Sequence, residues 1–134
     1  MDFFEYVTQK FPKIAQLKKS DEIYELYDLP FGDLTLSRTR LHLGQHTNGH
    51  VHMESGKTEV YQIISGSGLM QLCLVGGEKV QVPFEAPFNA PDQEPFPVKA
   101  GEIITVPVGY FHRLINTGDC DLIAFCTFPG GRNH

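Results

Sequence analysis

Short segments in which apolar and polar residues alternate follow one another through most of this chain, with glycine-rich turns between them. The clearest is residues 33–43, DLTLSRTRLHL, where leucines alternate with polar residues. Alternation with a period of two indicates β-strands, and many short strands with little helix indicate a sandwich or a barrel. The predicted strands cover residues 22–28, 33–43, 50–53, 58–65, 68–75, 78–82, 102–106, 111–116 and 121–128.

Two segments depart from this pattern. The N-terminal residues have apolar side chains at helical intervals up to Phe11 and a capping-box spacing between Asp2 and Glu5. They predict a short helix that Pro12 ends. Residues 83–97 contain five of the nine prolines, which excludes a central strand because proline cannot donate to a sheet ladder. This segment is either a surface crossing or a lid or dimer arm that carries phenylalanines over a cavity mouth.

The composition fits one soluble domain. The chain has 134 residues, of which 41% are hydrophobic and 20% charged. A net charge of −5 argues against a nucleic-acid partner, and no apolar run or N-terminal signal pattern points to a membrane or to secretion. Three cysteines without a CxxC pair predict reduced thiols. We therefore expect a single cytoplasmic domain over 1–134, with residues 1–21 as an N-terminal segment and 22–128 as its β-body.

Histidines are concentrated in one part of the chain. His46, His50 and His52 fall within seven residues, and a strand would place His50 and His52 on one face. A hairpin would bring Glu59 beside this pair, and His112 begins a later predicted strand. Three imidazoles and one carboxylate suit a divalent first-row transition metal such as Fe, Mn, Ni, Co or Zn and leave positions for water or substrate.

Residues 101–116, GEIITVPVGYFHRLIN, resemble the second conserved motif of the cupin family, G-x5-P-x-G-x2-H-x3-N. Every fixed position matches, and a chance match somewhere in the chain has a probability of about one in 10⁵. The matching residues are Gly101, Pro107, Gly109, His112 and Asn116.

Residues 44–66 resemble the first cupin motif, G-x5-H-x-H-x3,4-E-x6-G, although six residues separate His52 from Glu59. The resemblance implies an all-β, jelly-roll-type barrel in which His50, His52, Glu59 and His112 hold one metal ion. The matching residues are Gly44, His50, His52, Glu59 and Gly66.

The longer spacing, T-x-G-H-x-H-x6-E-V-Y, is similar to that of the archaeal-type glucose-6-phosphate isomerases, which are cupins. This resemblance implies that Thr47 and the backbone of Gly49 help to hold a sugar phosphate. It also implies that Tyr61 lines the sugar pocket and that His134 reaches in from the C-terminal tail. Phe128 stands where that family has a tyrosine. The candidate catalytic residues are Glu59, Tyr61 and His134.

Aldose–ketose isomerisation requires a cation on the two reacting oxygens and a group that moves a proton between C1 and C2. Glu59 is a ligand, a general base, or each in turn, whereas a hydride shift would need no base. Arg38 and Arg40 share one strand face; they clamp a phosphate if that face points inward and form a solvated edge if it points outward. His134 or His46 is a candidate for assisting ring opening.

Three functions compete. The first is a metal-dependent isomerase of a sugar or sugar phosphate, which Thr47 and Tyr61 favour. The second is a cupin dioxygenase or lyase with the same metal site, for which Phe128 and the phenylalanines of residues 83–97 would supply an apolar pocket. The third is a metal- or sugar-binding cupin without turnover. The expected partners are a small-molecule substrate and a second copy in a homodimer, because the N-terminal segment is too apolar to stay exposed.

Overall fold

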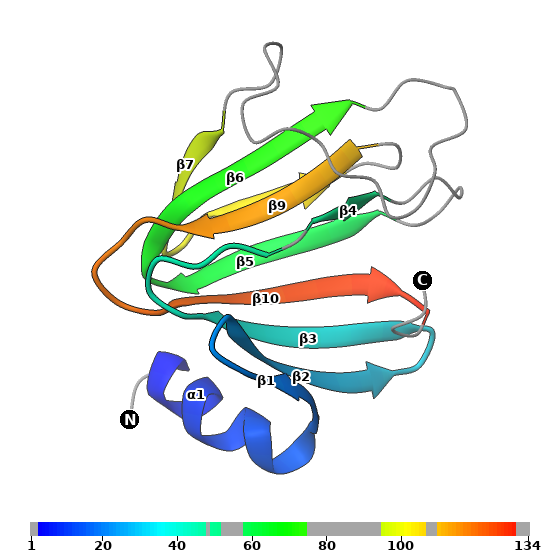
Figure 1. Ribbon diagram of the computed structural model, residues 1–134. Helices are drawn as coiled ribbons and strands as arrows, with labels where there is room; N and C mark the ends of the chain where they lie inside the picture. The colour runs from blue at the N-terminus through cyan, green and yellow to red at the C-terminus, as the bar shows by residue number, and fades with distance from the viewer. Residues whose placement is uncertain (1–2, 48, 52–57, 75–94, 107–109, 131–134) are drawn as a thin grey trace.

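The computed structural model describes residues 3–47, 49–51, 58–74, 95–106 and 110–130. Within these ranges, helix α1 (Phe3–Ile14) precedes ten strands (Figure 1). These are β1 (Gln16–Ser20), β2 (Tyr24–Phe31), β3 (Leu34–Leu41), β4 (His50–Val51), β5 (Glu59–Ser65), β6 (Ser67–Leu74), β7 (Phe96–Lys99), β8 (Ile103–Val106), β9 (Tyr110–Asn116) and β10 (Leu122–Pro129).

The strands form two antiparallel sheets. Six strands in the order β1-β2-β3-β10-β5-β8 make one sheet, and four in the order β4-β9-β6-β7 make the other. Figure 1 shows the smaller sheet above the larger one, with α1 below the larger sheet. This arrangement confirms the predicted all-β fold with a short N-terminal helix. No helix in the described ranges has the length and apolar character that crossing a membrane requires.

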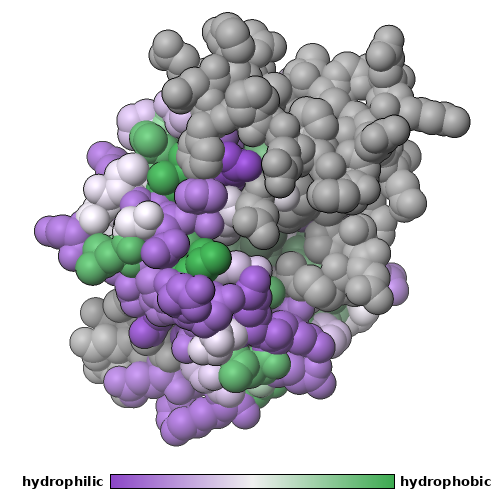
Figure 2. Space-filling view, viewed as in Figure 1, coloured by the Kyte–Doolittle hydropathy of each residue, from purple (hydrophilic) through white to green (hydrophobic). Residues whose placement is uncertain are grey.

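Both sheets contribute to one hydrophobic core. On the face seen in Figure 2, the described residues are mostly hydrophilic and hydrophobic residues form only small patches. Burial of each large apolar side chain stabilises the fold by about 1.5–3 kcal/mol. The core cluster consists of Leu41, Ile63, Met70, Val98, Leu114, Leu122 and Ala124.

Strand β3 has two covered faces. Ser37 and Thr39 line an interior cavity, and Leu41 belongs to the core. Leu36 faces the other way and lines a groove together with Phe11 of α1. Because the barrel interior covers one face and α1 lies against the other, the leucines of this strand do not keep a single register in the sequence.

Helix α1 continues past Pro12 to Ile14, so the prediction that this proline ends the helix was wrong. The amide of Ala15 still donates to the carbonyl of Phe11 at 3.0 Å. The ring of Phe11 packs edge-on against Phe125, with 5.0 Å between the ring centroids. These two contacts hold the last turn, and proline removes only one backbone donor from it.

Strands β1 and β7 were not predicted. Every residue of β1 is exposed, so its sequence shows no apolar alternation. Strand β7 contains Pro97 and lies at the edge of the smaller sheet, where proline is tolerated. Residues 83–94 of the proline-rich segment and the predicted strand at 78–82 lie outside the described residues.

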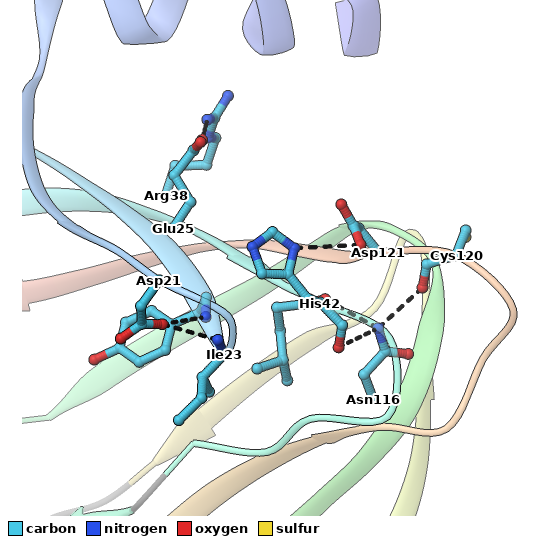
Figure 3. A network of polar contacts seen from close by, with 10 residues as sticks. Asp21, Ile23, Glu25, Arg38, His42, Asn116, Cys120 and Asp121 are labelled. Atoms are coloured by element: carbon cyan, nitrogen blue, oxygen red, sulfur yellow. Dashed lines mark hydrogen bonds and ion pairs between the residues drawn. The ribbon is translucent and has the colours of Figure 1, made fainter.

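Asn116, the last fixed residue of the second motif, closes the turn between β9 and β10 (Figure 3). Its Nδ2 donates to the carbonyls of Leu41 and Cys120, both at 2.9 Å, and its Oδ1 accepts from the amide of Gly118 at 3.0 Å. The side chain is 3% exposed. The Asn116 side chain therefore ties the end of β3 to this turn, and its role is structural.

Candidate functional site

A cavity of about 200 Å³ lies in the barrel and is lined by residues from both sheets. Most of the lining side chains carry hydroxyl, carboxyl, imidazole or thiol groups. The lining residues are Tyr24, Leu26, Ser37, Thr39, Thr47, Gly49, Glu59, Tyr61, His112 and Cys126.

Glu59 and His112 meet in this cavity. Glu59 begins β5 and His112 lies on β9, and their exposed fractions are 2% and 1%. Glu59 Oε2 is 3.3 Å from His112 Nε2. On its other side, His112 Nδ1 is 3.3 Å from the carbonyl of Tyr110. A carbonyl can only accept, so the contact with Tyr110 fits the tautomer that carries its proton on Nδ1, in which Nε2 turns its lone pair toward Glu59.

The contact between Glu59 and His112 fits a shared metal ion. In that tautomer Glu59 Oε2 and His112 Nε2 are both acceptors, and a cation between them would stabilise the pair. Metal–ligand bonds of about 2.0–2.2 Å place neighbouring ligand atoms roughly 3.0–3.5 Å apart, between right-angled and tetrahedral geometry. The observed 3.3 Å lies within this range. Both donor types also suit first-row divalent ions.

The other two predicted ligands are only partly placed. The backbone of His50 in β4 pairs with His112 in β9, whereas His52 lies outside the described residues. Within the described ranges, no group of three or more histidine, cysteine, aspartate or glutamate side chains is arranged to hold a metal. The complete four-ligand site therefore stays a prediction.

Tyr61 lies beside these two residues on β5. Its ring meets the imidazole of His112 edge-on, with 5.8 Å between the ring centroids. Burial, the largest cause, raises the pKa of Tyr61 well above its usual value, and electrostatic interactions with Cys126 and Glu59 raise it further. The phenol consequently keeps its proton at neutral pH and remains a hydrogen-bond donor.

Thr47 and Gly49 border the cavity next to β9. The amide of Leu114 donates to Thr47 Oγ1 at 3.0 Å, which leaves the hydroxyl proton of Thr47 able to donate. Gly49 has a φ of +83°, and a Cβ there would contact the ring of Phe111 and approach the carbonyl of His112 to 2.9 Å. Glycine is therefore required where this loop passes His112.

The structure does not bring Arg38 or Arg40 to the cavity. Arg38 forms an ion pair with Glu25 at 2.6 Å, and its guanidinium lies over the ring of Tyr27. Figure 3 shows Arg38 and Glu25 on the side of the sheet that faces α1. The strand face that carries Arg38 therefore points away from the cavity. Arg38 is nevertheless only 1% exposed, so it does not form a solvated edge. Burial, the largest cause, lowers the pKa of Arg38.

The two additional histidine candidates differ in position. His46 is exposed, and its Nδ1 lies 3.0 Å from the carbonyl of Thr47. His134 lies outside the described residues.

Five cavity residues were not anticipated from the sequence: Tyr24, Leu26, Ser37, Thr39 and Cys126. Ser37 and Thr39 share one face of β3, and Arg38 and Arg40 share the opposite face. The sequence shows this alternation but does not show which of the two faces points into the cavity. Cys126 and Cys120 carry free thiols, as predicted.

Comparison with solved structures identifies the fold. CapF from Staphylococcus aureus superposes with a TM-score of 0.69 at 18% identity, over 95% of this chain and 32% of that one. A predicted oxalate decarboxylase from Thermotoga maritima gives a TM-score of 0.63 at 19% identity, over 89% and 96% of the two chains. These neighbours are cupins, so the chain has the cupin fold.

Comparison with sequences identifies closer relatives. Glucose-6-phosphate isomerase of Pyrococcus abyssi is 31% identical over 88% of this chain and 61% of its own length. That of Thermococcus onnurineus is 29% identical over 88% and 60%. The chain thus spans about 60% of the length of these relatives.

Its organisation as a single domain and its cytoplasmic location stay predictions.

A family-wide comparison covers most of the residues that line the cavity. The glucose-6-phosphate isomerase (GPI) family matches residues 42–131, which include both motifs and the Glu59–His112 contact. Together with the archaeal relatives and the cupin neighbours, this match shows that the chain belongs to the glucose-6-phosphate isomerase family, in its archaeal, cupin-type branch.

Proposed function

We propose that this protein is a metal-dependent isomerase that interconverts the aldose and ketose forms of a sugar phosphate, with glucose 6-phosphate and fructose 6-phosphate as the first pair to test. The observation that carries the proposal is the buried contact between Glu59 and His112 inside a hydroxyl-lined cavity. The names of the sequence relatives support the substrate class.

The proposed metal ligands are His50, His52, Glu59 and His112, and Fe, Mn, Ni, Co and Zn all suit this set. The ion would polarise the oxygens on C1 and C2 of the sugar. Glu59 moves the proton between these two carbons. The contacts of its carboxylate with His112 and Tyr61 inside the cavity support this role.

The remaining cavity residues orient the sugar. Tyr61 donates a hydrogen bond to a substrate oxygen, since its phenol stays protonated. Thr47 donates its hydroxyl proton, and the backbone at Gly49 lies next to it to receive the phosphate. Ser37 and Thr39 face the cavity from β3 and bind sugar hydroxyls. In this proposal His134 assists the opening of the sugar ring.

NMR turnover in D₂O tests the function. Protein loaded in turn with Mn, Fe(II), Co, Ni and Zn is incubated with fructose 6-phosphate, and Glu59→Gln serves as the isosteric variant. We expect glucose 6-phosphate with deuterium at C2, and loss of turnover in the variant. Product without deuterium would indicate either a hydride shift or a proton transfer that is shielded from solvent. No product from any loaded form would rule out this substrate pair.

We also propose that the protein forms a homodimer through the outer face of the larger sheet. An apolar groove of about 560 Å³ lies there between α1 and β5, β8 and β10. Ile14 and Ile103, which line it, are each 65% exposed, and such patches mark association sites. Light scattering should give a dimer that Ile103→Lys dissociates, whereas Phe31→Ser, at another exposed apolar position, leaves it intact. A monomeric wild type would contradict this.

A further inference from the structure

Cys126 lies in the cavity but has no part in the isomerisation described above. It is on β10, directly paired with Tyr61 of β5, and is 6% exposed. Its Sγ donates to Glu59 Oε2 at 3.2 Å. The same oxygen lies 3.3 Å from His112 Nε2. The thiol thus contacts the one carboxylate oxygen that faces the other placed ligand.

A carboxylate has two chemically equivalent oxygens, and rotation about its last bond exchanges them. A donor fixed on one oxygen removes this freedom. Thiols donate weakly in water, but a hydrogen bond to a charged group is stronger in a buried, low-dielectric site. Partners of this kind orient metal ligands, and their loss typically lowers metal affinity by about 10- to 100-fold.

We propose that Cys126 is a positioning residue for Glu59: its S–H holds Oε2 toward His112 and so fixes the carboxylate in its metal-binding orientation. This inference rests on the metal site of the proposed function. A thiol that donates to a carboxylate keeps its own proton, and metal-binding cysteines are thiolates.

Metal affinity tests the role independently of turnover. Apo protein competes with a chromophoric chelator for Zn and for Co(II), in wild type, Cys126→Ala, Cys126→Ser and Cys120→Ala. We expect Cys126→Ala to weaken binding by about tenfold or more. Cys126→Ser, which keeps a donor, should restore most of the affinity. Cys120→Ala, at the exposed thiol, should leave it unchanged.

Stability measurements separate positioning from packing. If Cys126→Ala fails to fold, Cys126→Val replaces it, because valine fills the space of the thiol without a donor. A valine variant with the melting temperature of wild-type apo protein but reduced metal affinity supports the proposal. Unchanged affinity in the folded variant that lacks the donor would overturn it.

Two further outcomes are decisive. A thiolate-to-cobalt charge-transfer band in the wild type that disappears in Cys126→Ser would show direct coordination and overturn the positioning role. Tight, His112-dependent metal binding without turnover of fructose 6-phosphate would rule out the proposed substrate pair, and the affinity loss in Cys126→Ala would still establish the role of the thiol.

Discussion

His50 and His112 are directly paired across the antiparallel ladder of β4 and β9. The two residues are far apart in the sequence, and backbone register alone brings them together. Glu59 reaches the same place from the other sheet, with its Oε2 at 3.3 Å from His112 Nε2. The site therefore depends on how the two sheets face each other, and changes in the β9 backbone should affect it directly.

Replacement of His112 by alanine should abolish metal binding and leave a folded barrel. The variant loses a direct ligand, so metal affinity should fall by at least about 100-fold, the upper end for loss of an outer-shell partner. Metal content after dialysis and far-UV circular dichroism measure the two effects. The control is His46→Ala, because His46 is exposed and does not line the cavity. Full metal occupancy in His112→Ala would remove His112 from the ligand set.

Gly49→Ala should reduce both stability and activity. At a φ of +83° the new Cβ would be strained, and it would press on the Phe111 ring and the His112 carbonyl. We expect a loss of about 2–4 kcal/mol in the free energy of unfolding, measured in urea. Turnover should fall with it because the His112 backbone must shift.

Gly32→Ala is the matched control for this prediction. Gly32 also has a positive φ, +61°, but nothing lies within 4 Å of the added Cβ. Gly32→Ala should lose only about 1 kcal/mol of unfolding free energy, which is the cost of a positive φ for a residue with a Cβ, and should keep full activity. Equal effects of the two substitutions would show that contact with β9 is unimportant.

The sequence predicted those parts of the fold that alternation encodes. Strands expected at 58–65 and 121–128 occur as Glu59–Ser65 and Leu122–Pro129. Strand β1 was missed because both its faces are exposed, and β7 because Pro97 is tolerated only by its edge position. In both cases the deciding factor is the position in the sheet, which no local pattern contains.

The same limit applies to the site. The motif spacing predicted Glu59 and His112, and the structure brings their side chains together. Ser37 and Arg38 are neighbours in the sequence, yet one faces the cavity and the other faces away. Which of them points inward follows from the covering of β3 by α1, a tertiary contact. Cys126 was missed for the same reason.

Arg38 substitutions should change stability and leave substrate affinity intact. Arg38→Ala leaves Glu25 without its partner, and this carboxylate is 27% exposed. Since partial exposure weakens the effect, we expect a loss of about 2–3 kcal/mol, less than for a fully buried pair. Arg38→Met, which keeps the packing of the stem, should lose less. The KM for fructose 6-phosphate should not change in either variant.

Thr39→Ala provides the contrast, because Thr39 is adjacent to Arg38 but lines the cavity. Its KM should rise and its melting temperature should stay close to that of the wild type. A raised KM in Arg38→Met would instead support the phosphate-clamp interpretation of this arginine.

The free energy of unfolding should depend on pH through Asp21, which lies in the turn between β1 and β2. The amides of Tyr24 and Ile23 donate to Asp21 Oδ1 at 3.0 and 2.8 Å, and they lower the pKa of Asp21 below its usual value of 3.8. A carboxyl with a lowered folded-state pKa contributes stability above its unfolded-state pKa, and this contribution disappears as the pH falls through the folded-state value. The difference in unfolding free energy between wild type and Asp21→Asn should therefore be constant near pH 7 and shrink below pH 3.8. Urea unfolding at pH 7 and pH 3 measures it, with Asp119→Asn as the control for loss of a surface charge. A difference of the same size at both pH values would show that the charge of Asp21 does not stabilise the turn.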